Sequence, residues 1–261
     1  MEKKIFSKHD LKKDLLNLGI KKDDILLVHS SMKSIGNVEG GADTVIDVFM
    51  EYITEGLLIF PTHTWKQINE NYNIFDPKKE PSCVGILSNI FLKRKNVFRS
   101  LHPTHSIAVY GKNSEDFVKG EEVFDTPLNR NGCWGKIYDL KSKILFIGCN
   151  LNTNTIIHGV EEWCGIPNRL SDKYQNLKIK IDDKLIERPI KRHHNDYGDV
   201  SKNYGKLEKP LIKLGIAKIG KFGDAKTYII DSYEMINLVI KFLKKDPDLF
   251  LTDKPIPENW Y

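Results

Sequence analysis

The sequence lacks paired cysteines and long apolar runs, and both deficits narrow the class of protein. Its 261 residues include four cysteines, which lie far apart without a C-x-x-C pair. We therefore predict neither a disulfide framework nor a zinc knuckle, and we expect a reduced, cytoplasmic setting. Charged residues interrupt the apolar stretches near the N-terminus, so we expect no signal peptide. No stretch approaches a membrane-spanning length, so we expect no membrane partner.

Nucleotide-binding and nucleic-acid-binding signatures are also missing. The net charge is only +5, and both signs are scattered through the chain. No basic stripe interleaved with aromatics is visible, so we expect no nucleic-acid partner. Neither G-x-G-x-x-G nor G-x-x-x-x-G-K-[ST] occurs, and the nucleophile pattern G-x-S-x-G is absent.

The periodicity of apolar residues predicts an α/β unit. Ser7 followed by Asp10 predicts a capped helix that ends at Gly19. Another helix is expected from about residue 152, capped by Asn152 or Thr153. Strand-length apolar runs lie at 25–28, 57–60, 106–110 and 143–148, and further helical runs lie at 42–53 and 84–92. Strand, helix and strand in the order of 25–60 predict a right-handed parallel crossover.

The pattern changes near Tyr174. Hairpins are predicted over 177–190, turning at 182–184, and over 218–230, with helices over 207–214 and 233–244. No repeat, low-complexity tract or linker separates domains. The sequence therefore predicts one α/β domain with a smaller antiparallel portion in its last third.

A polar loop with several glycines joins the first predicted strand to its helix. His29 and Ser30 stand at the carboxyl end of the strand, where open α/β sheets hold ligands. Gly36 leaves backbone amides unobstructed before a helix N-terminus, which attracts anions, and Lys33 adds a cation. The loop therefore suits an anion, although a turn capping a buried helix explains the same residues when the stretch is taken alone.

Two further clusters of polar residues have both a functional and a structural explanation. Arg99, His102 and His105 lie just before a predicted strand, and bidentate arginine suits phosphate oxygens. The alternative is a surface loop, which we prefer for His105. The stretch 191-KRHHNDYGD-199 offers carboxylates and imidazoles for a substrate wall, or else forms a charged loop.

The most informative stretch is 152-NTNTIIHGVEEWCG-165. Thr155, His158 and Glu161 follow one another at three-residue spacing, so they face broadly one way on a helix. A carboxylate behind an imidazole suits a general base, and by geometry Glu162 could be the partner instead of Glu161. A solvent-facing pair is the alternative. A third ligand at metal-site spacing is not visible, so we expect no metal.

Taken in order, these motifs resemble the aminoglycoside N3-acetyltransferase family. The matching stretches are LLVHSSMKSIGNVEGGADTVIDV, LLIFPTHTW, FRSLHPTHSIAVYG, CWGKIYDL, ILFIGCNLNTNTIIHGVEE and the late HHND segment, from about Leu15 to Leu243. The resemblance implies one acetyltransferase domain over 1–261, with a mixed central sheet flanked by helices. It also implies an antiparallel subdomain at about 174–230 that forms part of the substrate cleft, on a fold unrelated to the GCN5 type.

The family resemblance also implies the chemistry. Acetyl-CoA would be the cosubstrate, and the acetyl group would pass directly to an amino group of an aminoglycoside. One alternative acceptor is an amino sugar, or its nucleotide-linked form, used in surface polysaccharide synthesis. A second alternative is a catalytically inactive, coenzyme-A-binding regulator, against which the intact T-x-x-H-x-x-E motif argues. The partner is thus a small-molecule amine, and a homo-oligomer is left open.

Site residues follow from the resemblance one by one. Thr155, His158 and Glu161 match its T-x-x-H-x-x-E helix, which favours Glu161 over Glu162 and makes His158 the general base. The residues expected to bind the coenzyme are Ser30, Ser31, Lys33, Ser34, Gly36, Val38, Arg99, His102 and Ser106. His194 and Asp196 match the late segment of the family and are expected to bind substrate. Asp76 and Asp199 are added to the expected substrate residues for their carboxylates and not from the resemblance.

The sequence offers groups for both kinds of acceptor. A polycationic aminoglycoside calls for carboxylates, which Asp76, Asp196 and Asp199 would provide. A nucleotide-linked sugar calls for cations and an aromatic ring, which Lys191, Arg192 and Trp65 would provide. The order of residues in the late segment departs from the family pattern, as does G-C-W-G in place of S-P-x-G, so the two acceptor classes remain open at this level.

Overall fold

A seven-stranded mixed sheet forms the centre of the computed structural model, which describes residues 4–196 and 198–261. The strand order is β11-β12-β8-β2-β4-β7-β6, and central β2 (Ile25–Ser30) pairs in parallel with β4 (Leu57–Pro61) and β8 (Lys143–Ile147). The outer strands pair antiparallel: β6 (Phe98–Arg99), β7 (Ile107–Gly111), β11 (Ala217–Phe222) and β12 (Ala225–Asp231). The predicted α/β class and the parallel pairing of the first two long strands are confirmed.

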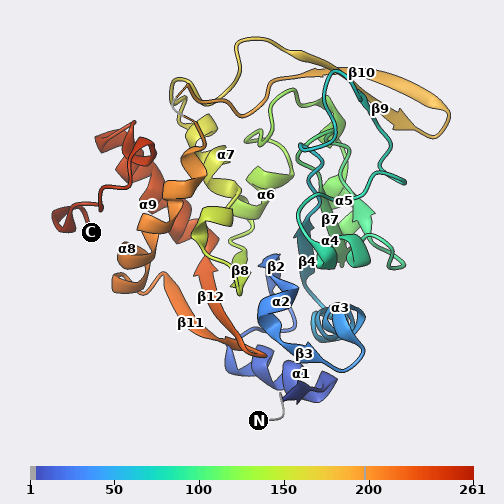
Figure 1. The fold of residues 1–261 in the computed structure, drawn as a ribbon, viewed down its shortest axis with the longest axis vertical. Coiled ribbons are helices and arrows are strands. Elements are labelled where there is room, and N and C mark those ends of the chain that lie inside the picture. Colours follow the sequence, from blue (N-terminus) through green and yellow to red (C-terminus); the bar gives the residue numbers. More distant parts are fainter. Residues whose placement is uncertain (1–3, 197) are drawn as a thin grey trace.

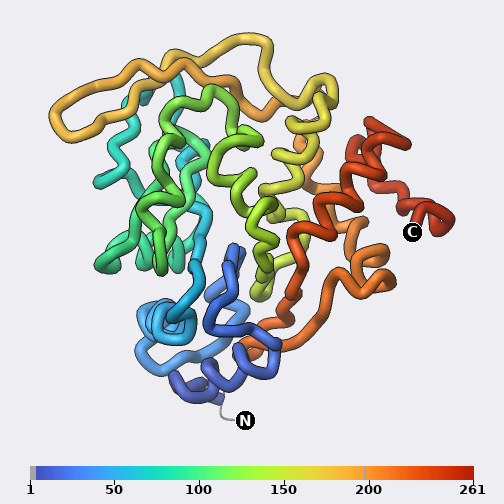
Figure 2. Tube along the Cα trace, turned by 180° about the vertical axis from the view of Figure 1, so that it is seen from behind, coloured from blue at the N-terminus to red at the C-terminus, as the bar shows by residue number. Residues whose placement is uncertain are grey.

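Helices cover both faces of this sheet because side chains alternate along each strand. Leu26 and Val28 pack into one apolar core, whereas Leu27 packs into the other. The first core includes α1 (Lys8–Asn17), α3 (Gly41–Tyr52) and α4 (Ile86–Phe91). The second includes α5 (Ser114–Val118), α6 (Cys133–Asp139), α7 (Ile156–Trp163), α8 (Glu208–Lys213) and α9 (Ser232–Lys245). In both views α8 and α9 lie across the molecule from α3 and α4 (Figure 1, Figure 2).

A second, three-stranded sheet carries the first predicted hairpin. Strands β9 (Gln175–Ile181) and β10 (Lys184–Ile190) pair antiparallel, and β5 (Ile74–Phe75) adds to β9 in parallel. The hairpin projects from the end of the molecule opposite α1 (Figure 1). It has its own small core of Ile68, Phe75, Leu177, Ile179 and Ile190.

The second predicted hairpin belongs to a different sheet from the first. Strand β12 pairs with β8, so β11 and β12 extend the central sheet and do not join β9 and β10 in one antiparallel unit over 174–230. Strand β12 pairs within the central sheet because its side chains are buried on both faces of that sheet. Tyr228 and Ile230 pack into one core, while Ala225 and Ile229 pack against the other.

Two predicted helix boundaries differ in how well they match the structure. Ser7 and Asp10 form the predicted capping box of α1. By contrast, the helix expected from Asn152 begins only at Ile156, after a 3₁₀ turn, η2 (Leu151–Thr153). Neither Asn152 nor Thr153 caps it. The side chain of Asn150 accepts a hydrogen bond from the Asn152 amide and so stabilises the 3₁₀ turn.

The remaining elements are short. Strands β1 (Ile5–Phe6) and β3 (Asn37–Val38) pair in parallel, and α2 (Met32–Ile35) lies between β2 and β3. The other 3₁₀ turns are η1 (Glu121–Val123), η3 (Val200–Leu207), η4 (Leu249–Leu251) and η5 (Glu258–Trp260). Across residues 4–196 and 198–261, no helix combines the length and the apolar character needed to cross a bilayer.

Candidate active site

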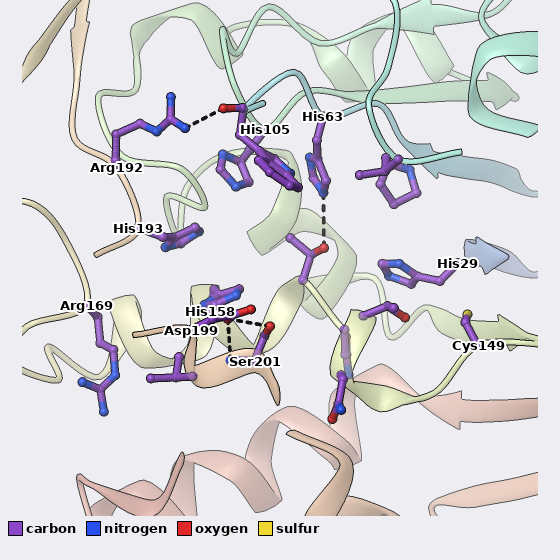
Figure 3. A pocket seen from close by; sticks show the side chains of 18 of the residues that line it. His29, His63, His105, Cys149, His158, Arg169, Arg192, His193, Asp199 and Ser201 are labelled. Carbon is purple, nitrogen blue, oxygen red and sulfur yellow. Dashed lines mark hydrogen bonds between the residues drawn. The ribbon is translucent and has the colours of Figure 1, made fainter. Parts of the chain in front are cut away.

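A cavity of about 730 Å³ opens at the carboxyl ends of the three parallel strands. His29 and Ser30 reach it from β2, Pro61 and His63 from the end of β4, and Cys149 from the end of β8. The cavity therefore lies where the sequence places a ligand crevice. Figure 3 shows His29 and Cys149 on one side of this pocket and Arg169 and Arg192 on the other.

The opposite wall comes from the start of α7 and from the last third of the chain. Thr155 and His158 lie at the start of α7, and Arg192, His193 and Asp199 belong to the predicted polar cluster at 191–199. Within that cluster, Tyr197 lies outside the described residues. The two stretches that sequence analysis singled out therefore meet in one pocket.

The hydroxyl of Tyr204 joins His158 to Glu161. It lies 2.8 Å from Nδ1 of His158 and 2.6 Å from Oε2 of Glu161, to which it donates. The imidazole and the carboxylate themselves are 3.9 Å apart. Glu161 is thus connected to His158, as expected, but through a tyrosine that sequence analysis did not identify.

The positions of the protons follow from the donors available. Burial raises the pKa of Tyr204 well above its usual value, so its hydroxyl is protonated, and its single proton goes to the carboxylate. Nδ1 of His158 must then carry the proton that binds the Tyr204 oxygen. We therefore assign the neutral tautomer in which Nε2 of His158 has a lone pair.

Glu161 is held by a buried cation. The Nε atom of Arg169 lies 2.6 Å from Oε1 of Glu161, and the side chains are 4% and 0% exposed. Burial raises the pKa of Glu161, while hydrogen bonds from Tyr204 and Arg169 act against that shift. The guanidinium therefore keeps a negative charge beneath the candidate catalytic imidazole.

Glu162 points to different partners. Its carboxylate accepts hydrogen bonds from the Thr126 hydroxyl and from the amide of Leu128. Burial raises the pKa of Glu162 to about 7. Of the two adjacent glutamates, only Glu161 is therefore connected to His158.

Histidine rings line the pocket in a chain of contacts. The ring centroids of His63 and His105 are 4.9 Å apart, those of His105 and His193 4.8 Å, and those of His193 and His158 4.5 Å. Burial lowers the pKa of all four, that of His158 to about 4. The rings are thus neutral at neutral pH. In the described part of the chain, no group of three or more His, Cys, Asp or Glu residues could hold a metal ion.

Thr155 also has a partner that sequence analysis did not identify. Its hydroxyl lies 3.2 Å from Nε2 of His63, whose Nδ1 is buried without a hydrogen-bond partner among the described residues. A buried N–H without an acceptor costs more than a buried lone pair, so we place the ring proton on Nε2. His63 then donates to Thr155 and leaves the hydroxyl hydrogen of Thr155 unused.

Of the coenzyme-binding residues predicted between Ser30 and Val38, Ser30 alone is among the described residues that line the pocket. Ser30 lines the cavity, whereas the hydroxyls of Ser31 and Ser34 bind each other at 2.9 Å, and Lys33 is exposed. Gly36 has a φ of 91°, a left-handed backbone conformation that favours glycine over residues with a Cβ. Val38 lies in the short strand β3, half-buried.

Three other predicted coenzyme residues lie behind the pocket wall. The guanidinium of Arg99 donates to the carbonyl oxygens of Pro77, Glu80 and Thr62. The Ser106 hydroxyl also binds the Thr62 carbonyl, and it accepts from Arg99.

His102 holds the loop that precedes β7. Its Nδ1 accepts from the backbone amides of Thr104 and His105, and its Nε2 donates to the carbonyl of Thr126. Arg99, His102 and Ser106 are therefore occupied with supporting the wall.

Some of the predicted substrate residues line the pocket and others do not. Asp199 lines the pocket, and it caps η3 by accepting from the amide and hydroxyl of Ser201. His194 also lines the pocket, and its Nε2 lies 3.0 Å from the exposed carboxylate of Asp196. Asp76 lies outside the lining, with its carboxylate 3.8 Å from Lys180.

Known proteins resemble this chain over most of its length. A family model described as aminoglycoside 3-N-acetyltransferase matches residues 27–244. Aminoglycoside N(3)-acetyltransferase IV of Salmonella sp is 26% identical over 247 residues, which cover 94% of this chain and 90% of that relative. Aminoglycoside N(3)-acetyltransferase III of Salmonella sp is 24% identical over 255 residues, which cover 88% and 89%.

Solved structures share the fold. The aminoglycoside acetyltransferase AAC(3)-IVa, as the apoenzyme, gives a TM-score of 0.81 at 25% identity and covers 98% of this chain and 93% of its own. A variant of the same enzyme in complex with a gentamicin gives 0.83, also at 25% identity, over 96% and 93%. AAC-IIIb, in a binary complex with CoASH, gives 0.82 at 18% identity over 97% and 100%, a likeness of fold.

Proposed function

The chain belongs to the aminoglycoside 3-N-acetyltransferase family, and from the pocket geometry we propose that it transfers the acetyl group of acetyl-CoA directly to an amino group of an aminoglycoside or a related amino sugar. As a member of this family it is an acyltransferase. The observation that carries the proposal is the chain of hydrogen bonds from Glu161 through Tyr204 to His158, which leaves Nε2 of His158 as a proton acceptor in the pocket.

His158 is the general base. An amine that is protonated at neutral pH cannot attack a thioester until it loses a proton. That proton is lost to solvent, and Nε2 takes a second proton from the nitrogen as the neutral amine attacks the acetyl carbonyl. When the C–S bond breaks, the imidazolium passes this proton to the departing sulfur, so coenzyme A leaves as the thiol. Because burial lowers the pKa of His158 to about 4, the ring of the free enzyme is neutral at neutral pH and its Nε2 lone pair is not already protonated.

Thr155 is the proposed donor to the tetrahedral oxyanion. The hydrogen bond from His63 orients the Thr155 hydroxyl and leaves its own hydrogen for the substrate. Thr155, at the amino end of α7, would therefore bind the oxyanion, while His158, one turn later, accepts a proton from the attacking nitrogen.

No acyl-enzyme is needed. Cys149 is the cysteine that lines the pocket, and burial raises the pKa of its thiol, so the nucleophilic thiolate is disfavoured. The Ser30 and Ser31 hydroxyls have no base within hydrogen-bond distance among the described residues, which supports a binding role for them.

The coenzyme is assigned to the side of the pocket formed by β2 and the loop after it. Ser30 and the exposed Lys33 are there, next to a turn whose backbone conformation favours Gly36. AAC-IIIb has been solved with CoASH, which supports the same cosubstrate here. The acceptor would then enter from the side of Trp65, Arg192 and Asp199.

Aminoglycosides and amino sugars are both retained as acceptors. The relatives' names give aminoglycosides, and AAC(3)-IVa has been solved with a gentamicin. The intact connection of Glu161 to His158 argues against an inactive coenzyme-A-binding regulator.

A panel of amines assayed with acetyl-CoA tests the function. Release of the thiol of coenzyme A is followed with a thiol-detecting reagent, and the acetylated product is identified by mass spectrometry. We expect turnover with at least one sugar amine, abolished by His158→Ala and retained by His9→Ala, which changes an exposed histidine outside the pocket. No acetylated product with any amine would refute the proposal.

A further inference from the structure

The acceptor side of the pocket is poor in negative charge. Among the described residues that line the pocket, Asp199 alone has a carboxylate, and its Oδ1 already accepts two hydrogen bonds from Ser201. Asp76 faces Lys180, and Asp196 is paired with His194 at 3.0 Å. A polycation with several ammonium groups would therefore lack the paired carboxylates that its desolvation requires.

The same wall carries an uncompensated positive charge. Two arginines line it, and Arg169 is neutralised by Glu161. Arg192 has no carboxylate within 4.0 Å among the described residues; its Nη1 donates to the carbonyl of Ile68 and the side chain of Gln175, and its Nη2 to the carbonyl of Trp65.

Arg192 has donors left for a ligand. A guanidinium has five N–H groups, and these three bonds leave the Nε hydrogen and one Nη2 hydrogen without a hydrogen-bond acceptor in the described part of the chain. Adjacent N–H groups on Nε and Nη form the fork that binds phosphate or carboxylate oxygens in a bidentate manner.

An exposed aromatic residue contacts this guanidinium through its backbone carbonyl. Trp65 lines the pocket and is 42% exposed, an unusual state for so large an apolar side chain. The hydrogen bond of 2.7 Å from Arg192 to the Trp65 carbonyl ties the two residues together. A ring could pack on the indole while an acidic group binds the guanidinium.

From this arrangement we infer that the acceptor is an amine that also carries a phosphate group, which Arg192 binds while Trp65 packs against the sugar or base. This inference rests on the proposed acetyl transfer at the same site and narrows its substrate class. Both ends of such an acceptor have partners in the pocket lining: Arg192 for the phosphate group, and His158 and Asp199 for the amino group.

Matched pairs of amines test the inference. Glucosamine is compared with glucosamine 6-phosphate and with UDP-glucosamine, and gentamicin represents the polycations. Binding is measured by calorimetry with coenzyme A present, so that the result does not depend on turnover. We expect at least one phosphorylated amine to bind roughly ten- to a hundredfold more tightly than glucosamine, an advantage that salt reduces.

Variants of Arg192 identify the group responsible. Arg192→Gln should remove the advantage of the phosphorylated amine, and Arg192→Lys, which keeps the charge, should restore part of it. Arg188→Gln is the matched control, because Arg188 also donates to a backbone carbonyl, that of Val123, but does not line the pocket. The KM for acetyl-CoA should stay the same in all three variants.

The outcomes that overturn the inference are distinct from those that overturn the function. If no phosphorylated amine binds more tightly than glucosamine, or if gentamicin binds best, the inference is wrong even where acetyl transfer is observed. An Arg192→Gln variant that raises the KM for acetyl-CoA would assign Arg192 to the coenzyme and would also overturn it. Phosphate-dependent binding without any acetyl transfer would support Arg192 as the phosphate-binding residue, but it would refute the proposed function and, with it, the assignment of the ligand as an acetyl acceptor.

Discussion

His158 and Glu161 lie 3.9 Å apart and are connected through the hydroxyl of Tyr204. The carboxylate therefore acts on the imidazole through the tyrosine hydroxyl. The intervening tyrosine fixes the orientation of the His158 ring and, by donating its single proton to Glu161, the tautomer of that ring.

Tyr204→Phe tests this connection. The variant keeps the ring that packs on Phe250 but loses the hydroxyl that binds both residues. We expect kcat to fall about 10- to 100-fold, less than the loss of a general base, while the KM for acetyl-CoA stays the same. Steady-state kinetics measure this. Tyr228→Phe, which removes a hydroxyl bound to Glu208 away from the pocket, is the control. Unchanged kcat in Tyr204→Phe would show that Glu161 orients the base in some other way.

His158→Ala should abolish the chemistry without affecting coenzyme binding. The loss of a general base typically lowers kcat by about 10²–10⁴. Coenzyme A affinity, measured by calorimetry, should match that of the unaltered protein, because the coenzyme is assigned to the β2 side of the pocket. Activity close to that of the unaltered protein would mean that the base lies elsewhere.

Glu161→Gln should affect stability as well as rate. The change removes the charge that compensates Arg169, and both side chains are buried. Breaking a buried ion pair costs about 3–5 kcal/mol, so the free energy of unfolding in urea should decrease by that order. Arg169→Met with Glu161→Gln should recover part of the loss. If Glu161→Gln alone is as stable as the unaltered protein, Glu161 and Arg169 are not a charged pair.

Acid should begin to destabilise the protein at pH values well above the pKa of ordinary carboxylates. Burial lowers the pKa of His29 to about 3 and those of His102 and His158 to about 4, whereas an unfolded histidine titrates near 6.5. Below pH 6.5 the unfolded chain thus binds more protons than the folded one. Stability should therefore be fully present above pH 6.5 and should decline as pH falls toward 4.

Thermal unfolding between about pH 7.5 and 4.5 measures that decline. His29→Gln removes one buried titrating group and should make the decline shallower. His9→Gln, at an exposed position, should leave its slope the same. A melting temperature independent of pH over this range would show that the buried rings do not control acid stability.

The coenzyme loop can be tested with truncated ligands. Lys33 is the exposed cation beside the Ser30 turn, so Lys33→Gln should weaken coenzyme A binding severalfold at low salt and leave pantetheine unaffected. Calorimetry with both ligands checks this. Equal weakening of both would indicate that the lysine supports the loop and does not contact phosphate.

Local patterns predicted most of the elements because alternating or helical periodicity is recorded in neighbouring residues. The strand at 25–30, the helix at 41–52 and the hairpin at 175–190 agree with the sequence within a few residues. Local patterns could not predict that the two hairpins belong to different sheets. Whether β12 pairs with β8 or with β9 depends on contacts between segments far apart in the chain.

The same distinction, between residues close in sequence and residues brought together by the fold, applies to the candidate site. Thr155, His158 and Glu161 share one helical stretch, so their spacing was sufficient to bring them together. Tyr204 reaches them from 43 residues beyond Glu161, and no motif marks it. Asp76 was expected at the pocket from its chemistry alone, and chemistry alone does not determine which of many carboxylates reaches a given cavity.

The small sheet has a core of its own, separate from the two cores of the central sheet, one of which holds α7. Arg192 follows closely on its strand β10, while His158 and Tyr204 belong to the central unit. On the roles proposed for Arg192 and His158, recognition of the acceptor and the chemistry of transfer are carried by parts of the chain that can change independently. Substitutions that reshape β9 and β10 could alter which amine enters without disturbing the proton path, so one catalytic apparatus could serve chemically unlike acceptors as the family diverges.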